Sequence, residues 1–540
     1  MLKRFLVLYL VIYLSWPISS LYARTLPAQM QQAVISRHIK VPAPAANALP
    51  GTASGDFVRA GAASLTQQDN TLVIDQETAK VLLEWATFDI GSGSTVKFNQ
   101  NPEDVAVNVI QDARPSRIFG KLVADGQIYL LNQNGVIFGE GSQVNVRGMI
   151  AAAAKLNGYD DLASISEDQK LTFLQNSLLD VIGDGKALLV VDDEAIRELG
   201  EENLPRIIVE KGAAIHSNDA PVVLAGPEVE NYGDILASNS QVVLAGGRKD
   251  FYLAVSDNDY DLRGYLVEVN SGSGSERGKV TNAGSIVATL GNVTLVGSEI
   301  IQAGEIKATS AVDVNGSIHI MARDQAKEVG DFQTLARNSA YWSAANFDVA
   351  RESTNLKPDG VTSSAGLVPD PPADQQTNQR PSTGKAFIGR EGGSVTFAPG
   401  SVTQVAVQDL DHGKLTPLLV DHGVDPVAFY KQSEAQQIAQ IKKLESDAER
   451  QFRLSDHVKY ATNQSLQRDS RLHVAGKSID LQENSVLRAK GAKITEVSGT
   501  GAWVNEGAAI SLVAKEDPLP GNDVREANSE ASITIGKNAL

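Results

Sequence analysis

The stretch Pro221-Val222-Val223-Leu224-Ala225-Gly226 decides the fold, because it returns twenty residues later as Gln241-Val242-Val243-Leu244-Ala245-Gly246. A second stretch, Asn231-Tyr232-Gly233-Asp234-Ile235-Leu236-Ala237, returns 51 residues later as Asn282-Ala283-Gly284-Ser285-Ile286-Val287-Ala288. Twenty residues after Ala283-Gly284 comes Ala303-Gly304. A unit of this length cannot bury its own apolar face, so neighbouring copies must stack on one another.

Short β-branched strands separated by glycine and asparagine at this period are typical of a parallel β-helix, whose rungs pair at a rise of ~4.8 Å. We therefore predict an all-β fold: a right-handed parallel β-helix (a solenoid) with short helical insertions. A leucine-rich repeat would need a Leu and Asn spacing that is absent here, and a β-sandwich would not repeat at twenty residues. We expect Gly226, Gly246 and Gly297 to turn corners with positive φ. The expected inward ladders contain Val222, Leu224, Val242, Leu244, Val293 and Leu295.

Composition excludes several classes of function. The chain of 540 residues carries 65 Asp and Glu against 48 Lys and Arg, a formal net charge of −17. Nucleic-acid binding depends on clustered cations, so we predict no nucleic-acid partner. The chain has no cysteine, which excludes disulfides, thiol catalysis and cysteine-ligated zinc.

The first 23 residues are typical of a secretory signal peptide. Lys3 and Arg4 precede an apolar run over 5–14, and Ala23 offers a small residue for cleavage. The apolar run has ten residues, whereas a membrane-spanning helix needs ~20. We therefore expect a signal peptide rather than a membrane anchor, and export through the general secretory translocon.

The rest of the chain divides into segments that differ in composition and in hydrophobic pattern. Strand patterns fill a first solenoid region and resume in a second one after a proline-rich stretch. An acidic insertion contains Ser166-Glu167-Asp168-Gln169, which predicts a capping box at the start of a short helix. The expected segments are an extended leader over 24–56, the first solenoid region over 57–330 with its insertion at about 156–204, an irregular and partly disordered segment over 331–385, and a second β-helix-like region over 386–540 with a helical insertion at about 425–452.

Six blocks of sequence between residues 55 and 154 stand in an order that a known family shares. They are NTLVIDQ at 70–76, WATFDIG at 85–91, VKFNQ at 96–100, RPSRIFG at 114–120, DGQIYL at 125–130 and LNQNGVIFG at 131–139. This stretch resembles the N-terminal secretion domain of the filamentous haemagglutinin family, the exoproteins of two-partner secretion. The resemblance makes 57–330 the two-partner secretion domain. The family-motif residues that we expect to be structural are Trp85, Phe88, Gly91, Pro115, Ser116, Ile118, Gly120 and Gly126.

The family signature Asn-Pro-Asn-Gly-Ile is matched at Asn132, Asn134 and Gly135, while Gln133 and Val136 depart from it. The second family motif, Asn-Pro-Asn-Leu, is not found. Asn-Gly is a tight-turn dipeptide, because glycine adopts positive φ at little cost. Two interpretations stay open: the turn is recognised by a transporter, or its residues are ordinary corners of the solenoid.

The resemblance implies a partner, an outer-membrane β-barrel transporter with periplasmic domains. It also implies secretion to the medium or to the surface of a Gram-negative bacterium by way of the periplasm. The expected function is that of an adhesin or surface-binding protein without a cofactor, whose host or bacterial ligand the sequence does not name. The alternatives are a β-helical polysaccharide-degrading enzyme and the delivery part of a contact-dependent toxin.

Metal and catalytic motifs are weak. Asp257, Asp259, Asp261 and Glu268 fall at positions one, three, five and twelve of an EF-hand-like loop, but Leu262 replaces its glycine and strand-like residues flank it. A solvated acidic loop is the alternative to this calcium site. No nucleophile, phosphate-loop or His-Glu-x-x-His motif occurs, so we predict no enzymatic activity. A second metal candidate, for which surface loops are the alternative, is the set Asp411-His412, Asp421-His422 and Asp456-His457.

The proline-rich stretch 352–385 has no core-forming period. We expect limited proteolysis of the mature protein to cut there before it cuts the rungs, and to leave two stable fragments. Mass spectrometry of the first fragments identifies the sites. First cuts inside residues 210–320 would contradict the assignment of the stable solenoid.

Overall fold

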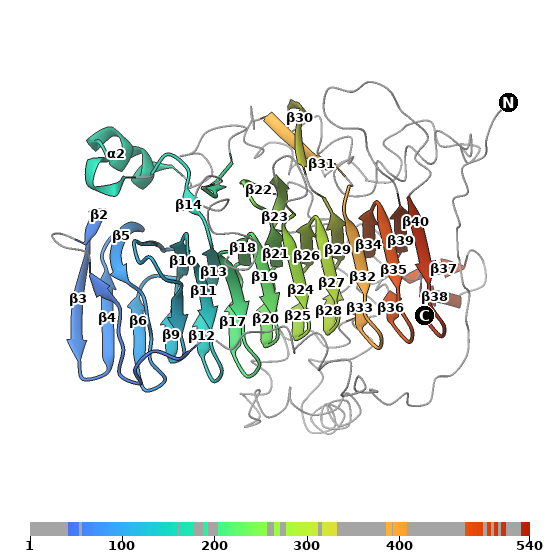
Figure 1. Ribbon diagram of the computed structural model, residues 1–540, viewed down its shortest axis with the longest axis horizontal. Helices are drawn as coiled ribbons and strands as arrows, with labels where there is room; N and C mark the ends of the chain where they lie inside the picture. Colours follow the sequence, from blue (N-terminus) through green and yellow to red (C-terminus); the bar gives the residue numbers. More distant parts are fainter. Residues whose placement is uncertain are drawn as a thin grey trace.

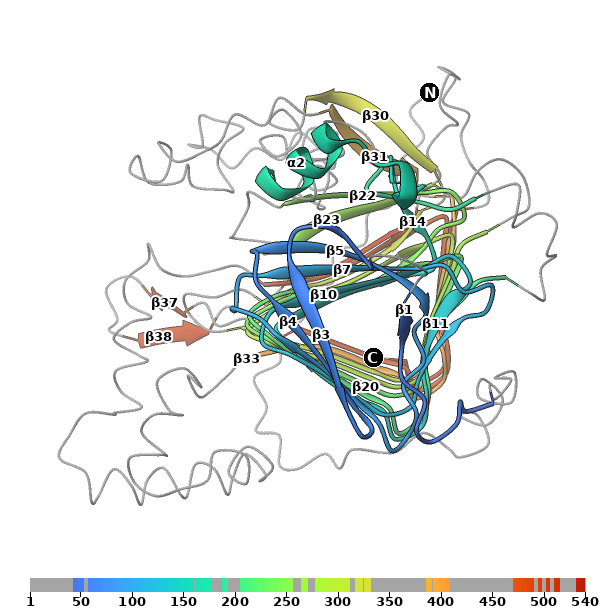
Figure 2. The same cartoon turned by 90° about the vertical axis from the view of Figure 1, so that its left-hand side faces the viewer.

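The computed structural model shows a parallel β-helix in which successive rungs add strands to three long sheets (Figure 1). Seen along its axis, the solenoid has a triangular section (Figure 2). The predicted fold class is therefore confirmed. The structure describes residues 42–52, 57–159, 161–176, 187–192, 204–255, 264–270, 277–310, 316–323, 325–331, 385–390, 392–407, 470–489, 494–497, 502–505, 509–514 and 531–539.

The three sheets, which we name A, B and C, hold 12, 11 and 9 strands of the described residues. In spatial order, sheet A contains β1 (Gly51–Thr52), β5 (Lys80–Thr87), β7 (Val105–Ile110), β10 (Gln127–Asn132), β13 (Gly148–Ala152), β18 (Val222–Gly226), β21 (Val242–Gly246), β26 (Val293–Gly297), β29 (Ile318–Ala322), β34 (Arg471–Gly476) and β39 (Ala509–Ala514), with β2 (Val58–Ala60) also on β5. Sheet B contains β3 (Ala63–Gln68), β4 (Thr71–Gln76), β6 (Thr95–Asn99), β9 (Lys121–Ala124), β12 (Gln143–Val146), β17 (Ala214–Asn218), β20 (Asp234–Ser238), β25 (Ser285–Thr289), β28 (Glu305–Ser310), β33 (Val402–Val407) and β36 (Val486–Ala489). Sheet C contains β8 (Ser116–Ile118), β11 (Gly135–Phe138), β16 (Arg206–Val209), β19 (Glu228–Asn231), β24 (Lys279–Asn282), β27 (Glu299–Gln302), β32 (Ser394–Phe397), β35 (Ser478–Leu481) and β40 (Ser532–Ile535).

Identical residues stack on the inner face of sheet A, as the repeat predicts. Val222 pairs with Val242, and Val242 pairs with Val293 on the next rung. Leu224, Leu244 and Leu295 form the parallel ladder beside it, and all six side chains are fully buried. The twenty-residue period is thus one rung. The 51-residue offset is one rung lengthened by the chain between β21 and β24.

A polar ladder stands at the corner between sheets C and B. The side-chain amide of Asn231 donates to Asn282 Oδ1 at 2.8 Å, and the amide of Asn282 donates to Gln302 Oε1 at 2.8 Å. All three side chains are fully buried. Because a shift of register would leave these buried amides without partners, the ladder favours the observed pairing.

The glycines that end the sheet A strands play a different part from the one expected. Gly226, Gly246 and Gly297 are absent from the glycines with positive φ, so that expectation was wrong. A Cβ on Gly226 would lie 2.9 Å from Ala153 Cβ, and one on Gly246 would lie 2.8 Å from the backbone of Lys279. These two positions need glycine because a neighbouring strand or turn approaches too closely for a side chain.

A second apolar core covers the outer face of sheet A. After β13, after β21 and after β29, the chain leaves the solenoid at the corner between sheets A and C (Figure 2). We call these three segments the excursions. The first two excursions form a four-stranded sheet of β14 (Lys155–Leu156), β15 (Leu189–Val190), β22 (Asp250–Val255) and β23 (Tyr265–Asn270). Phe251 and Val269 from this sheet pack with Val223 and Val243 of the solenoid. The central strands of sheet A are therefore buried on both faces.

Polar contacts join the covering layer to the solenoid. Glu268 of β23 forms a fully buried ion pair with Arg323, which follows β29. Burial raises the pKa of the Tyr129 phenol, which is hydrogen-bonded to Tyr265 of β23. The third excursion contributes the antiparallel pair of β30 (Gln325–Asp331) and β31 (Lys385–Arg390), and both strands contact β23. A further hairpin joins β37 (Ile494–Val497) and β38 (Ala502–Asn505).

The predicted helix and its capping box are present in the first excursion. The helix α2 (Glu167–Gln175) begins after Ser166, whose hydroxyl accepts from Gln169 N at 3.2 Å while the Gln169 side chain accepts from Ser166 N at 2.9 Å. Phe173 is buried in the second core and meets Tyr159 edge to face, and α2 contacts β2 and β5 of sheet A. A short 3-10 turn, η1 (Leu162–Ser164), precedes it.

Several sequence-based assignments lie outside the described residues. They are the signal peptide 1–23, most of the leader 24–56, nearly all of 331–385, and the helical insertion 425–452. In the last part of the leader, β1 pairs antiparallel with β5. In the part of the chain that is described, no helix has the length and apolarity to cross a membrane.

We predict that Phe251→Ala destabilises the covering layer by about 3–5 kcal/mol, because a fully buried ring is lost from the second core. Urea unfolding and hydrogen exchange of β22 and β23 measure the effect. Tyr252→Ala, on the opposite face of the same strand, is the matched control and should cost less. Equal losses for the two variants would contradict the second core.

Candidate functional site

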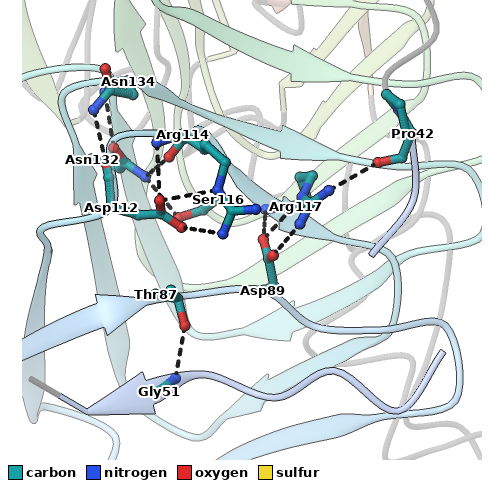
Figure 3. Close-up of polar contacts among 10 residues, drawn as sticks. All are labelled: Pro42, Gly51, Thr87, Asp89, Asp112, Arg114, Ser116, Arg117, Asn132 and Asn134. Carbon is teal, nitrogen blue, oxygen red and sulfur yellow. Dashed lines mark hydrogen bonds and ion pairs between the residues drawn. The ribbon is translucent and has the colours of Figure 1, made fainter. Parts of the chain in front are cut away.

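The signature residues form the turn that carries the chain from sheet A to sheet C. Asn132 ends β10 and is fully buried. Its side-chain amide donates to Arg114 O and to Ser116 Oγ, both at 3.0 Å (Figure 3). Its Oδ1 accepts from Asn134 N at 2.9 Å. The Asn132 side chain therefore ties its own turn to the turn of the preceding rung.

The other two signature residues complete this turn. The Asn134 side-chain amide donates to Asp112 O at 2.8 Å. Gly135 has φ +104, and a Cβ there would lie 2.3 Å from Arg206 O on the next rung. Glycine is therefore required at this position by both its backbone conformation and the close approach of β16.

The exposed rim of the turn is charged. The Asp112 carboxylate accepts from Arg114 N at 3.1 Å and from Arg114 Nη2 at 3.3 Å. The hydrogen bond and charge of Asp112 raise the pKa of Arg114. The Arg114 side chain keeps 61% of its surface exposed. We name Asp112 and Arg114 of the preceding turn, together with Gln133 and Asn134 of the signature turn, the rim, since a partner can reach this part of the corner in the folded domain.

A second ion pair joins Arg117 of β8 to Asp89, which follows β5. Arg117 Nη2 lies 2.5 Å from Asp89 Oδ2, and Arg117 N donates to Asp89 Oδ1 at 2.8 Å. Arg117 Nη1 also donates to Pro42 O at 3.5 Å (Figure 3). The side chain of Arg117 thus connects β8 both to the segment after β5 and to the N-terminal segment.

The N-terminal segment 42–52 packs against the first rungs through its backbone. Gly91 N donates to Ala48 O at 2.9 Å, and Gly93 N donates to Ala46 O at 2.8 Å. A Cβ on Gly91 would lie 2.1 Å from Ala45 O. Gly91 is therefore the position at which this segment can approach the solenoid.

The remaining family-motif residues hold the same rungs together. Trp85 is fully buried, donates from Nε1 to Asn108 Oδ1 at 2.9 Å and meets Phe88 edge to face at a centroid distance of 5.3 Å. Ile118 lies in the core opposite Phe138. Pro115 directly precedes β8, and the Ser116 hydroxyl accepts a hydrogen bond from the Asn132 amide. A Cβ on Gly120 would lie 2.2 Å from Gly91 O, and a Cβ on Gly126 would lie 2.6 Å from Asp104 O. Both positions therefore need glycine.

The metal candidates from the sequence are not brought together in the described part of the chain. Of the calcium set, Asp257, Asp259 and Asp261 lie outside the described residues, whereas Glu268 lies within β23 and pairs with Arg323. The loop is flanked by the strands β22 and β23, as its sequence indicated, rather than by EF-hand helices. All three Asp-His pairs lie outside the described residues. Within the described residues, no group of three or more His, Cys, Asp or Glu side chains could hold a metal ion.

Sequence reasoning did not assign roles to Asp89, Asp112, Arg114, Arg117 and Asn108. Three of them, Asp89, Arg114 and Arg117, stand inside the quoted blocks. An Asp separated by 28 residues from its Arg gives no local signal, because the pairing depends on which rungs become neighbours.

Comparison with known proteins identifies the family. A family model for the TPS secretion domain, the domain of two-partner secretion exoproteins, matches residues 51–333, more than half of the chain. The chain belongs to the TPS secretion domain family. The match begins at β1 and ends two residues after β30. The TPS secretion domain therefore contains the signature turn and the covering sheet, and the rungs from β32 onward lie beyond it.

Relatives match over part of their length. A heme/hemopexin-binding protein of Haemophilus influenzae is 32% identical over 209 residues, which are 38% of this chain and 20% of the relative. A second protein of that name from Haemophilus influenzae is 41% identical over 98 residues, 18% of this chain and 10% of the relative. The crystal structure of the HMW1 secretion domain from Haemophilus influenzae aligns with 89% of this chain and 98% of its own, at a TM-score of 0.42 and 15% identity.

We predict that the signature residues differ in their contribution to stability. Gly135→Val should cost most, because valine resists positive φ and its Cβ would meet Arg206 O. Asn132→Ala should cost about 1–3 kcal/mol, since buried partners lose their hydrogen bonds. Asn134→Ala should cost about 1 kcal/mol. Urea unfolding of the refolded proteins measures the order, and an Asn134→Ala loss larger than that of Gly135→Val would contradict the turn geometry.

Proposed function

We propose that the TPS secretion domain delivers this chain to a cognate outer-membrane transporter, and that the exported chain acts outside the cell as an adhesin-like, surface-binding protein. The observation that supports this most is the signature turn, placed within a domain that the family model matches. The proposed route passes through the periplasm of a Gram-negative bacterium after cleavage of the signal peptide.

The solenoid suits export of an unfolded chain. Each rung contacts its neighbours, so rungs can form one after another as the chain emerges. The lack of cysteine means that no disulfide closes a loop before transport. Burial of the stacked side chains after transport then favours outward movement.

We propose that the transporter contacts the rim, which spans the signature turn and the turn of the preceding rung, in the folded domain. The Asn132 amide is fully buried and bonded to the preceding rung, so it can touch a partner only before the turn forms. Arg114 projects its guanidinium into solvent, and Asn134 is half-buried beside it. The two stages of recognition therefore use different residues, Asn132 before folding and Arg114 afterwards.

A binding role is the proposal for the exported chain, and we propose no enzymatic activity. The relatives are named as heme/hemopexin-binding proteins, and the match spans only 20% and 10% of their lengths. Heme or hemopexin binding is therefore not proposed for this chain. In the part of the chain that the structure describes, no second sheet covers sheets B and C, and the long sides of a solenoid are extended surfaces of the kind that repeat proteins use for binding.

We expect Arg114→Ala to lower the fraction of protein that reaches the medium when the chain is co-expressed with its partner transporter in a Gram-negative host. The measurement is immunoblotting of medium and periplasm. Arg147→Ala is the matched control, because Arg147 is also ion-paired on the surface, to Glu103, and lies away from the rim.

Asn132→Ala separates the two stages of recognition. Variants that refold normally yet accumulate in the periplasm support recognition of the signature turn. Wild-type secretion of Arg114→Ala, Asn134→Ala and Asn132→Ala together would leave these residues as solenoid corners and contradict the proposed recognition site.

A further inference from the structure

The outer face of sheet C carries charges whose sign alternates from rung to rung. Arg206 of β16 lies opposite Glu228 of β19, with Nε 2.7 Å from Oε2. Lys279 of β24 lies opposite Glu228 on the next rung, and Glu299 of β27 lies opposite Lys279 with Oε2 3.6 Å from Nζ. Val280, beside Lys279, faces the solenoid core, so the alternation of the strand places the charges outside.

The other features of β24 and β27 do not distinguish the two strands. They begin twenty residues apart. Val280 and Ile300 are paired in the solenoid core. Asn282 and Gln302 are paired in the amide ladder, and each strand is followed by an Ala-Gly corner. By apolar pattern and amide chemistry, either strand could therefore add to β19.

The choice between these strands arises after the second excursion. The chain reaches β24 only after it has formed β21, β22 and β23. If β27 paired with β19 instead, the loop between the paired strands would be twenty residues longer. Loop-closure entropy grows with the logarithm of loop length, so it favours β24 only slightly. We call this alternative, with β27 on β19, the skipped pairing.

Like charges oppose the skipped pairing on two sheets. On sheet C it would set Glu299 opposite Glu228, where a lysine stands in the native pairing. On sheet B it would bring β28 onto β20 and set Glu305 opposite Asp234, where a serine stands natively. Like charges directly opposite each other on paired strands are destabilising. The skipped pairing would therefore create two repelling carboxylate pairs, one on each sheet.

We propose that the charges on sheets C and B select β24 rather than β27 as the neighbour of β19 while the solenoid forms. The completed native solenoid buries one rung more than the skipped pairing, and this burial favours it once the rung is in place. The charges act earlier, when the first contacts of the returning strand form. This inference does not depend on the proposed export or binding function.

The test exchanges two charges without changing composition or net charge. In Lys279→Glu/Glu299→Lys, the native pairing sets two carboxylates opposite each other and the skipped pairing sets a lysine opposite Glu228. We expect the skipped fraction after refolding from urea to rise about tenfold, because the charge interaction changes sign in both pairings. Glu103→Arg/Arg147→Glu is the control, since these two partners keep each other, and it should refold like the wild type.

Thiol cross-linking of the refolded mature chain identifies the strand that lies on β19. The chain has no cysteine, so two introduced thiols are the only ones. Glu230→Cys/Thr281→Cys reports the native pairing, because these positions lie opposite each other. Glu230→Cys/Ile301→Cys reports the skipped pairing. Natively these two positions are two rises of ~4.8 Å apart, beyond the reach of a disulfide.

A second measurement does not depend on whether the exchanged variant folds. The chain with its natural charges and the skipped-pairing thiols is refolded at low salt and in about 1 M NaCl, where the screening length falls to ~3 Å. The skipped-pairing cross-link should increase in high salt. The proposal is overturned if salt leaves this cross-link unchanged, if the charge exchange leaves it unchanged in chains that refold, or if the control exchange raises it equally.

Discussion

The constraint on which this molecule depends is in-register parallel pairing between rungs. A rung has no core of its own, so each inward side chain is buried only when the same position of the next rung lies directly above it. Val222, Val242 and Val293 meet this condition with identical side chains. A one-residue slip would turn every such side chain to the opposite face, so apolar burial and hydrogen bonding favour the same register.

The corners reinforce the register through polar groups. At the corner between sheets C and B, the side chains of Asn231, Asn282 and Gln302 are hydrogen-bonded from rung to rung. At the corner between sheets A and C, the Asn132 amide donates to Arg114 and Ser116 of the preceding rung. Each amide is buried, so misalignment would cost unmade hydrogen bonds. The signature turn is therefore one of the hydrogen-bonded corners that keep neighbouring rungs in register. Its recognition by a transporter, if the export experiment supports it, is an additional use of a structural corner.

The covering layer explains why the excursions leave from one corner. Sheet A has apolar residues on both faces, so a solenoid without a cover would expose Val223, Ala225, Val243 and Ala245. The strands β22 and β23 bury this outer face, and Glu268 pairs with Arg323 beside them. Described strands of sheet B instead alternate buried positions with partly or fully exposed ones. The excursions thus form a second layer of the fold that buries the outer face of sheet A.

The sequence by itself determined the solenoid, its inward ladders and the capping box of α2, because each depends on a local period or on spacing within one turn. It also identified Asn132, Asn134 and Gly135 as a tight turn from the Asn-Gly dipeptide. Only the tertiary structure decided that Gly226 and Gly246 serve close approach, that Asp89 pairs with Arg117, and that Glu268 pairs with Arg323. Those contacts join residues on different rungs or excursions. Which of them become neighbours depends on the length of each excursion, and a periodic pattern carries no information about that.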